Sequence, residues 1–172
     1  TMGKYFGTDG VRGVAGADLT CEMAMLIGRG AAAVLTSSTG HKPRILIGKD
    51  TRQSGDMLEA ALTAGLCSVG ADVESLGVVP TPAVAYLVRK YNADAGVVIS
   101  ASHNPMEFNG IKIFAGTGYK LPDDVEEEIE AHIDDKCAGI PLATGDGVGR
   151  VTRRIDGIKD YVEHLYESIG GD

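Results

Sequence analysis

Apolar and polar positions along the chain follow two different periods, which predict strands interleaved with helices. Short continuous apolar runs bounded by glycine, proline or charged residues are typical of strands covered on both faces. Other segments repeat apolar residues three and four positions apart, which is the spacing of an amphipathic helix. The predicted strands are residues 44–48, 71–76, 95–100 and 110–114. The predicted helices are residues 20–35, 54–69, 82–89, an acidic helix beginning near 122, and 157–169.

Three residues mark predicted helix starts. Thr20 and Ser54 precede the first two helices, where a hydroxyl can accept a hydrogen bond from a free backbone N–H. Pro122 stands near the start of the acidic helix, a position that tolerates proline. Acidic residues fill the first turns of that helix, where the positive end of the helix dipole favours them.

Strands that alternate with helices predict a three-layer α/β/α domain with a mostly parallel mixed sheet. A length of 172 residues suits one domain, so we expect residues 1–172 to form a single α/β domain. Residues 139–150 are rich in glycine and poor in apolar residues, so they predict a long loop. Residues 151–172 are expected to extend toward a part that is missing. In such folds, ligands bind beyond the carboxyl ends of the strands.

Composition and charge limit the partners and the cellular compartment that we expect. The formal net charge is −8, which argues against nucleic acid as a partner. No apolar run is long enough to cross a membrane, so we expect no membrane partner. The cysteines are odd in number and form no Cys-x-x-Cys pair, which predicts reduced thiols in a cytoplasmic protein. Hydrophobic residues make up 44% and aromatic residues only 5%, so the predicted core is aliphatic.

Two glycine-containing polar segments have the composition of anion sites. In residues 5–13, glycines surround Thr8, Asp9 and Arg12, so the backbone could approach an anion and the arginine could cover it. The second segment, residues 48–55, carries Lys49 and Arg52 between a strand and a helix, where free N–H groups bind anions. An ordinary glycine turn and a routine strand–helix loop are the alternatives. Thr8, Arg12, Lys49 and Arg52 are therefore candidate phosphate-binding residues.

A third polar segment, Ser-Ala-Ser-His-Asn-Pro at residues 100–105, directly follows a predicted strand. Asn104 precedes a proline and is therefore pushed away from helical geometry, which predicts a turn that exposes Ser102. A hydroxyl in this position could accept and return a phosphoryl group. The neighbouring His103 could bind the phosphate or move a proton. A polar surface turn is the alternative.

A fourth segment, Asn-Gly-Ile-Lys at residues 109–112, places Lys112 on a short apolar strand. In a partly desolvated cationic cleft its pKa would fall, and it could then act as a general acid or base. The alternative is an edge-strand lysine that protects against aggregation. Two other motifs are set aside: residues 145–150 fail the Gly-x-Gly-x-x-Gly pattern, and the acids at 123–130 fit a solvated helix face.

Taken together, these segments resemble the α-D-phosphohexomutase family across essentially the whole chain. The resemblance rests on Phe-Gly-Thr-Asp-Gly-Val-Arg-Gly at residues 6–13 and on the serine segment. It implies that Ser102 is the residue phosphorylated in the active enzyme and that its phosphate provides one Mg²⁺ ligand. It implies that His103 is an active-site histidine and that Lys112 is a general acid or base. It also implies that Arg12 and Arg52 face the reacting phosphate.

The Ser-Ala pair before Ser102 is similar to the branch of this family that acts on glucosamine phosphates, whereas mannose and glucose branches carry threonine there. The resemblance implies interconversion of hexosamine 6- and 1-phosphates through a hexosamine 1,6-bisphosphate. Relatives have four domains, so we expect domains II–IV to be absent here, the isolated domain to be inactive, and the full enzyme to be a possible homodimer. A mannose or glucose phosphate mutase, a non-catalytic sugar-phosphate binding module and, more weakly, a Ser–His hydrolase are the alternatives.

Overall fold

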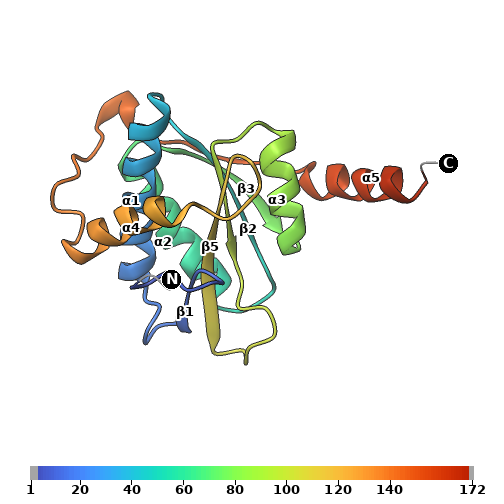
Figure 1. Ribbon diagram of the computed structural model, residues 1–172, viewed down its shortest axis with the longest axis horizontal. Helices are drawn as coiled ribbons and strands as arrows, with labels where there is room; N and C mark the ends of the chain where they lie inside the picture. Colours follow the sequence, from blue (N-terminus) through green and yellow to red (C-terminus); the bar gives the residue numbers. More distant parts are fainter. Residues whose placement is uncertain (1–3, 171–172) are drawn as a thin grey trace.

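The computed structural model of the protein describes residues 4–170 and has three layers around one mixed sheet (Figure 1). The six strands lie in the order β1-β5-β4-β2-β3-β6. The central strands β4, β2 and β3 run parallel, and β6 continues parallel to β3. Strand β5 runs antiparallel to β4, and β1 runs antiparallel to β5. The prediction of a three-layer α/β domain with a mostly parallel mixed sheet is confirmed. The strands are β1 Val11–Val14, β2 Arg44–Lys49, β3 Asp72–Val78, β4 Ala95–Ile99, β5 Phe108–Ala115 and β6 Val151–Arg153.

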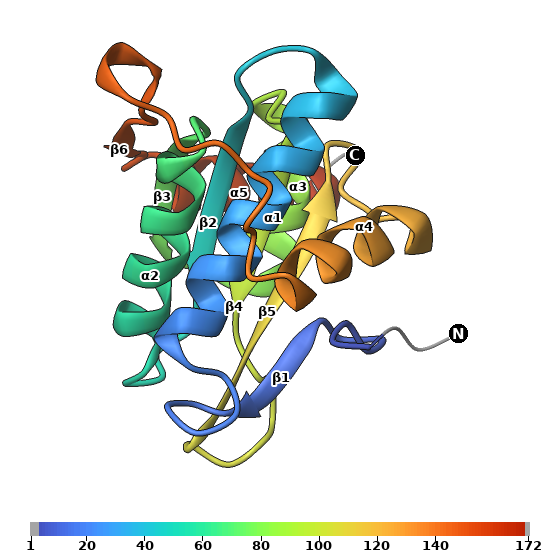
Figure 2. The same ribbon diagram turned by 90° about the vertical axis from the view of Figure 1, so that its left-hand side faces the viewer.

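Helices cover both faces of the sheet. On one face, α1, α2 and α4 enclose the larger apolar core, and on the other face α3 encloses the smaller one (Figures 1 and 2). Both cores are mainly aliphatic, as the composition predicts. The helices are α1 Cys21–Thr39, α2 Gly55–Ser68, α3 Thr81–Lys90, α4 Asp123–Asp134 and α5 Gly157–Ile169.

One predicted helix cap is present as expected and the other is not. The Oγ1 atom of Thr20 accepts a hydrogen bond from the N–H of Met23 at 3.1 Å, which caps α1. Ser54 precedes α2 but makes no capping bond. Its Oγ instead accepts a hydrogen bond from Nδ2 of the buried Asn109 at 2.9 Å. This bond ties the start of α2 to β5.

Two strands have no counterpart in the predicted elements. Strand β1 is short, and Arg12 and Gly13 interrupt its apolar residues, so it has no continuous apolar run. Strand β6 has three residues, all exposed, at the outer edge of the sheet. Neither strand carries a continuous apolar run: β1 buries only Val11 and Gly13, and β6 buries no residue. Residues 139–150 are mostly loop, as expected, with one 3₁₀ turn at Gly145–Gly147.

Helix α5 projects beyond α3 and packs only its first turns against it (Figure 1). The ring of His164 stacks on Tyr86 at 3.9 Å between centroids, and the Tyr91 hydroxyl donates to Asp160. Outward-facing apolar side chains, among them Ile158 and Ile169, remain exposed on α5. Within residues 4–170, no helix combines the length and apolar character needed to cross a membrane.

Candidate functional site

The candidate site is a cavity of about 200 Å³ where β4 ends and the serine segment begins. Ser100 and Ser102 reach it from the loop after β4, Arg12 from β1 and Lys112 from β5. This is the carboxyl end of a parallel strand, where the sequence places the site. The lining residues are Asp9, Arg12, Thr81, Val98, Ser100, Ser102 and Lys112.

The pairing of β1 with β5 brings the two cations together. Arg12 lies opposite Gly110 in the ladder, and Lys112 lies two residues further along β5. Positions two apart on a strand share a face, so both side chains lie on the cavity side. Gly110 leaves room for the arginine, because a Cβ atom there would lie 2.9 Å from Arg12 Cγ. Strand β5 lies between β1 and β4 in the sheet, and its ladder with β1 ends at Ile111, one residue before Lys112. The Lys112 side chain lines the cavity, which favours a role there over the edge-strand alternative.

A tight turn places Asp9 at the same cavity. The N–H of Gly7 donates to the carbonyl of Gly10 at 3.1 Å, and the N–H of Gly10 donates back at 3.4 Å. Gly10 has φ +85°, and a Cβ atom there would lie 2.3 Å from the carbonyl oxygen of Ile111. Only glycine tolerates both this positive φ and so close an approach to the Ile111 carbonyl. Thr8, at the tip of this turn, is exposed and does not line the cavity.

Ser102 has an unusual backbone conformation, with φ +56°. Its N–H donates to Ser100 Oγ at 3.1 Å, and its carbonyl accepts from Arg52 Nη2 at 2.9 Å. Its side chain is exposed at the cavity, as the sequence predicts. The adjacent His103 is exposed on the same loop but does not line the cavity.

Arg52 does not face the cavity as a free phosphate ligand, because its donors bind other groups of the protein. A guanidinium has five N–H donors, and all of them are engaged within 3.2 Å. Nε donates to Asp50 Oδ2. The two terminal nitrogens donate to carbonyl oxygens of the loop at residues 100–107, called the serine loop, and of the start of β5. Arg52 is not among the cavity-lining residues. The four carbonyls belong to Ser102, Asn104, Pro105 and Phe108.

The other candidate cation in this region, Lys49, also lies away from the cavity. Its Nζ is 2.8 Å from Asp56 Oδ1 and 3.3 Å from Glu59 Oε2. Burial on its own would lower the pKa of Lys49, but hydrogen bonds and charge from these two acids raise it above its ordinary value. The same contact lowers the pKa of Asp56. Lys49 therefore joins β2 to α2 and does not add charge to the cavity.

The charge balance of the cavity suits an anion. Two cations, Arg12 and Lys112, line it with one acid, Asp9. The nearby Asp50 carboxylate is paired with Arg52 at 3.2 Å. Within residues 4–170, no three histidine, cysteine or acidic side chains gather into a metal site. The cavity therefore presents two cations and one carboxylate around the Ser102 side chain.

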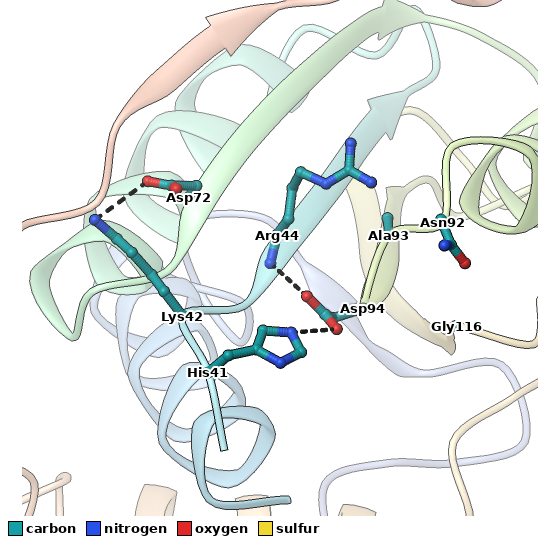
Figure 3. Close-up of a pocket in the computed structure, with 8 residues that line it drawn as sticks. All are labelled: His41, Lys42, Arg44, Asp72, Asn92, Ala93, Asp94 and Gly116. Carbon is teal, nitrogen blue, oxygen red and sulfur yellow. Dashed lines mark hydrogen bonds and ion pairs between the residues drawn. The ribbon is translucent and has the colours of Figure 1, made fainter. Parts of the chain in front are cut away.

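A larger cavity, of about 630 Å³, lies at the opposite ends of the parallel strands (Figure 3). Its basic side chains are already paired with acids. His41 Nε2 lies 2.9 Å from Asp94, and Lys42 Nζ lies 3.5 Å from Asp72. Its lining contains no serine, threonine or cysteine nucleophile. The smaller cavity is therefore the better candidate for phosphoryl chemistry.

Sequence reasoning missed two residues that the structure brings to the serine loop. Asp50 accepts a hydrogen bond from Ser100 Oγ at 2.7 Å, and its Oδ1 accepts the N–H of Arg52 at 3.0 Å. Thr81, the first residue of α3, lines the cavity. Asp50 stands between Lys49 and Arg52 in the sequence, so its position could have indicated a role near the site. Thr81 stands between two prolines and carried no such signal.

Comparisons with known proteins agree with this geometry. The chain is 60% identical over 171 residues to a phosphoglucosamine mutase of Acetivibrio thermocellus and 58% identical to one of Clostridium acetobutylicum. Each match covers 99% of this chain and 38% of the relative. A solved phosphoglucomutase/phosphomannomutase family protein from Burkholderia thailandensis has a TM-score of 0.74 at 25% identity, covering 100% of this chain and 36% of that one.

The chain thus spans well under half the length of the curated relatives that it matches. A family model described as phosphoglucomutase/phosphomannomutase, alpha/beta/alpha domain I, matches residues 3–138. That range contains β1 to α4 and every candidate site residue, and it ends before β6 and α5. The chain belongs to the phosphoglucomutase/phosphomannomutase family, of which it carries the first α/β/α domain.

Proposed function

We propose that the chain is the phosphoserine-bearing domain of a phosphoglucosamine mutase, which interconverts glucosamine 6-phosphate and glucosamine 1-phosphate. The observation that carries the proposal is the Ser102 side chain at a cavity shared with Arg12 and Lys112. The high identity to phosphoglucosamine mutases favours glucosamine over mannose or glucose phosphates.

In the proposed reaction, the phosphoryl group on Ser102 passes to the free hydroxyl oxygen of the sugar phosphate. The Oγ–P bond breaks as the new O–P bond forms. The Lys112 ammonium donates a proton to the departing Ser102 Oγ, and the resulting amine takes the proton of the sugar hydroxyl. The resulting 1,6-bisphosphate turns over, and its other phosphoryl group returns to Ser102. Phosphoryl transfer depends mainly on positioning and charge neutralisation, and Arg12 supports it by facing the same cavity. His103, on the same loop, is a second candidate proton carrier.

Mg²⁺ would supply further neutralisation of the transferring phosphoryl group. Oxygen ligands suit this ion. In this proposal the phosphate on Ser102 would provide one ligand, and the Asp9 carboxylate, which lines the same cavity, would be a further oxygen donor. The remaining ligands would come from further domains of the enzyme.

We propose a cytoplasmic bacterial enzyme that supplies amino-sugar phosphates for peptidoglycan precursors, and a homodimer of the full-length protein is part of this proposal.

The direct test is Ser102→Ala in the full-length enzyme. We expect turnover of glucosamine 6-phosphate to fall by at least about 10³-fold, because the group that accepts the phosphoryl is gone. Ser68→Ala is the matched control, since Ser68 is a half-buried serine at the end of α2, outside the cavity. Comparable activity in the two variants would contradict the proposal. Equal catalytic efficiency on mannose or glucose phosphates would contradict the assigned sugar.

A further inference from the structure

The backbone of Ser102 is held at both of its polar groups. A non-glycine residue at φ +56° persists only where the surroundings fix it. Here the N–H of Ser102 donates to Ser100 Oγ, and its carbonyl accepts from Arg52. With both groups bound, the Ser102 side chain is the free part of the residue, and it faces the cavity.

The Ser100 hydroxyl connects Ser102 to a carboxylate. A hydroxyl has one hydrogen to donate and lone pairs to accept. Ser100 donates that hydrogen to Asp50 Oδ2 at 2.7 Å, so its lone pairs remain for the N–H of Ser102 at 3.1 Å. Asp50 is fixed in turn, because its own N–H donates to the carbonyl of Ile99 at the end of β4. The orientation of the Ser100 hydroxyl is therefore set by the sheet.

Arg52 completes this network from the other side. Its five donors bind Asp50 and four loop carbonyls, so no N–H remains for a phosphate. Its charge also neutralises Asp50, which would otherwise repel a phosphate on the neighbouring loop. The arginine side chain is only 10% exposed, which agrees with a role inside the loop.

We propose that Asp50, Ser100 and Arg52 are positioning residues that hold the Ser102 loop in its reactive conformation, and that Arg52 does not bind the transferred phosphate. This inference rests on the proposed function, because it concerns the same serine. It predicts that the loss of any member reduces the rate of phosphoryl transfer while substrate binding is retained.

The first test uses Ser100 variants of the full-length enzyme. We expect Ser100→Ala to lower kcat by about 10- to 100-fold, since a misplacement of about 1 Å costs roughly that much, with KM changed less than about threefold. Ser100→Thr keeps the hydroxyl and should restore most of the rate. Ser68→Ala removes a hydroxyl that also donates once, to Gly65, and accepts once, from Arg29. This control should leave kcat unchanged.

The second test separates positioning from phosphate binding at Arg52. A lysine cannot make five forked hydrogen bonds, so Arg52→Lys should lower kcat about as much as Ser100→Ala and leave KM unchanged. A crystal structure of the variant should show Ser102 released from φ +56°. A raised KM with an intact loop would instead make Arg52 a phosphate ligand and overturn the proposal.

The outcomes distinguish this inference from the proposed function. If Ser102→Ala abolishes turnover but Ser100→Ala keeps normal kcat, the serine is the phosphoryl carrier and the positioning network is refuted. If Ser102→Ala itself remains active, the proposed function fails first. If Ser100→Ala loses activity and Ser100→Thr does not recover it, the hydroxyl is not the group that matters, and the inference is also overturned.

Discussion

Two buried glycines of α1 face different helices: Gly28 lies against α2 and Gly30 lies against α4. Gly28 and Gly30 are both buried in α1, so alanine brings the same gain in helix propensity, about 1 kcal/mol, at either position. A Cβ atom on Gly28 would lie 2.5 Å from the carbonyl oxygen of Leu62 and 3.0 Å from the N atom of Leu66. A Cβ atom on Gly30 would lie 3.3 Å from side-chain atoms of α4 and 3.4 Å from a backbone oxygen.

These distances predict opposite effects on stability. Ordinary contact begins near 3.4 Å, so Gly28→Ala forces the α1 and α2 backbones apart by nearly 1 Å, which no rotamer change can relieve. Overpacking costs about 1–3 kcal/mol, and a backbone clash belongs at the upper end. After the propensity gain, we expect Gly28→Ala to lose about 2 kcal/mol. Gly30→Ala needs a shift of only a few tenths of an ångström, so it should be neutral or up to about 1 kcal/mol more stable.

The assay is thermal and urea unfolding followed by circular dichroism, with both variants beside the unchanged chain. A difference of about 2–3 kcal/mol between the variants corresponds to roughly 4–12 °C in Tm for a chain of this size. Gly28→Ala should be the less stable. Equal Tm values, or a higher Tm for Gly28→Ala, would refute the reasoning from helix contact.

Two further predictions concern groups away from the cavity. Burial raises the pKa of the Cys67 and Cys137 thiols. A thiolate-selective alkylating agent at pH 8 should therefore label the half-buried Cys21 first. Mass spectrometry follows the labelling, and equal rates at the three cysteines would contradict this prediction. Lys49→Met removes the cation beside Glu59, so the free energy of unfolding should drop by about 1 kcal/mol. The kcat per folded molecule should stay within about threefold. A large loss of kcat would show that Lys49 acts in the site.

Much of the fold was predictable because its central elements are buried. Strand β2 contains the buried apolar run 45–47, and β4 is buried throughout. Helix α5 is mostly exposed, and its predicted bounds match because its apolar residues keep helical spacing. Strands β1 and β6 were not predictable from apolar runs, because their residues are partly or wholly exposed.

The site was predictable in its types of residue but not in their contacts. Ser102, Arg12 and Lys112 come together at one cavity, as their segments suggested. The engagement of Arg52 with loop carbonyls and of Lys49 with α2 acids depends on side-chain directions after folding. A basic residue in the sequence is therefore a candidate phosphate ligand, and only the fold shows whether other groups already bind its side chain.

The most direct test of the central claim is to locate the phosphoryl group on the full-length enzyme. The enzyme is incubated with glucosamine 1,6-bisphosphate, digested, and its peptides are sequenced by mass spectrometry. The account predicts one phosphate, on Ser102, that disappears when glucosamine 6-phosphate is added in excess. A transferable phosphate on Ser100, His103 or any other residue would contradict it.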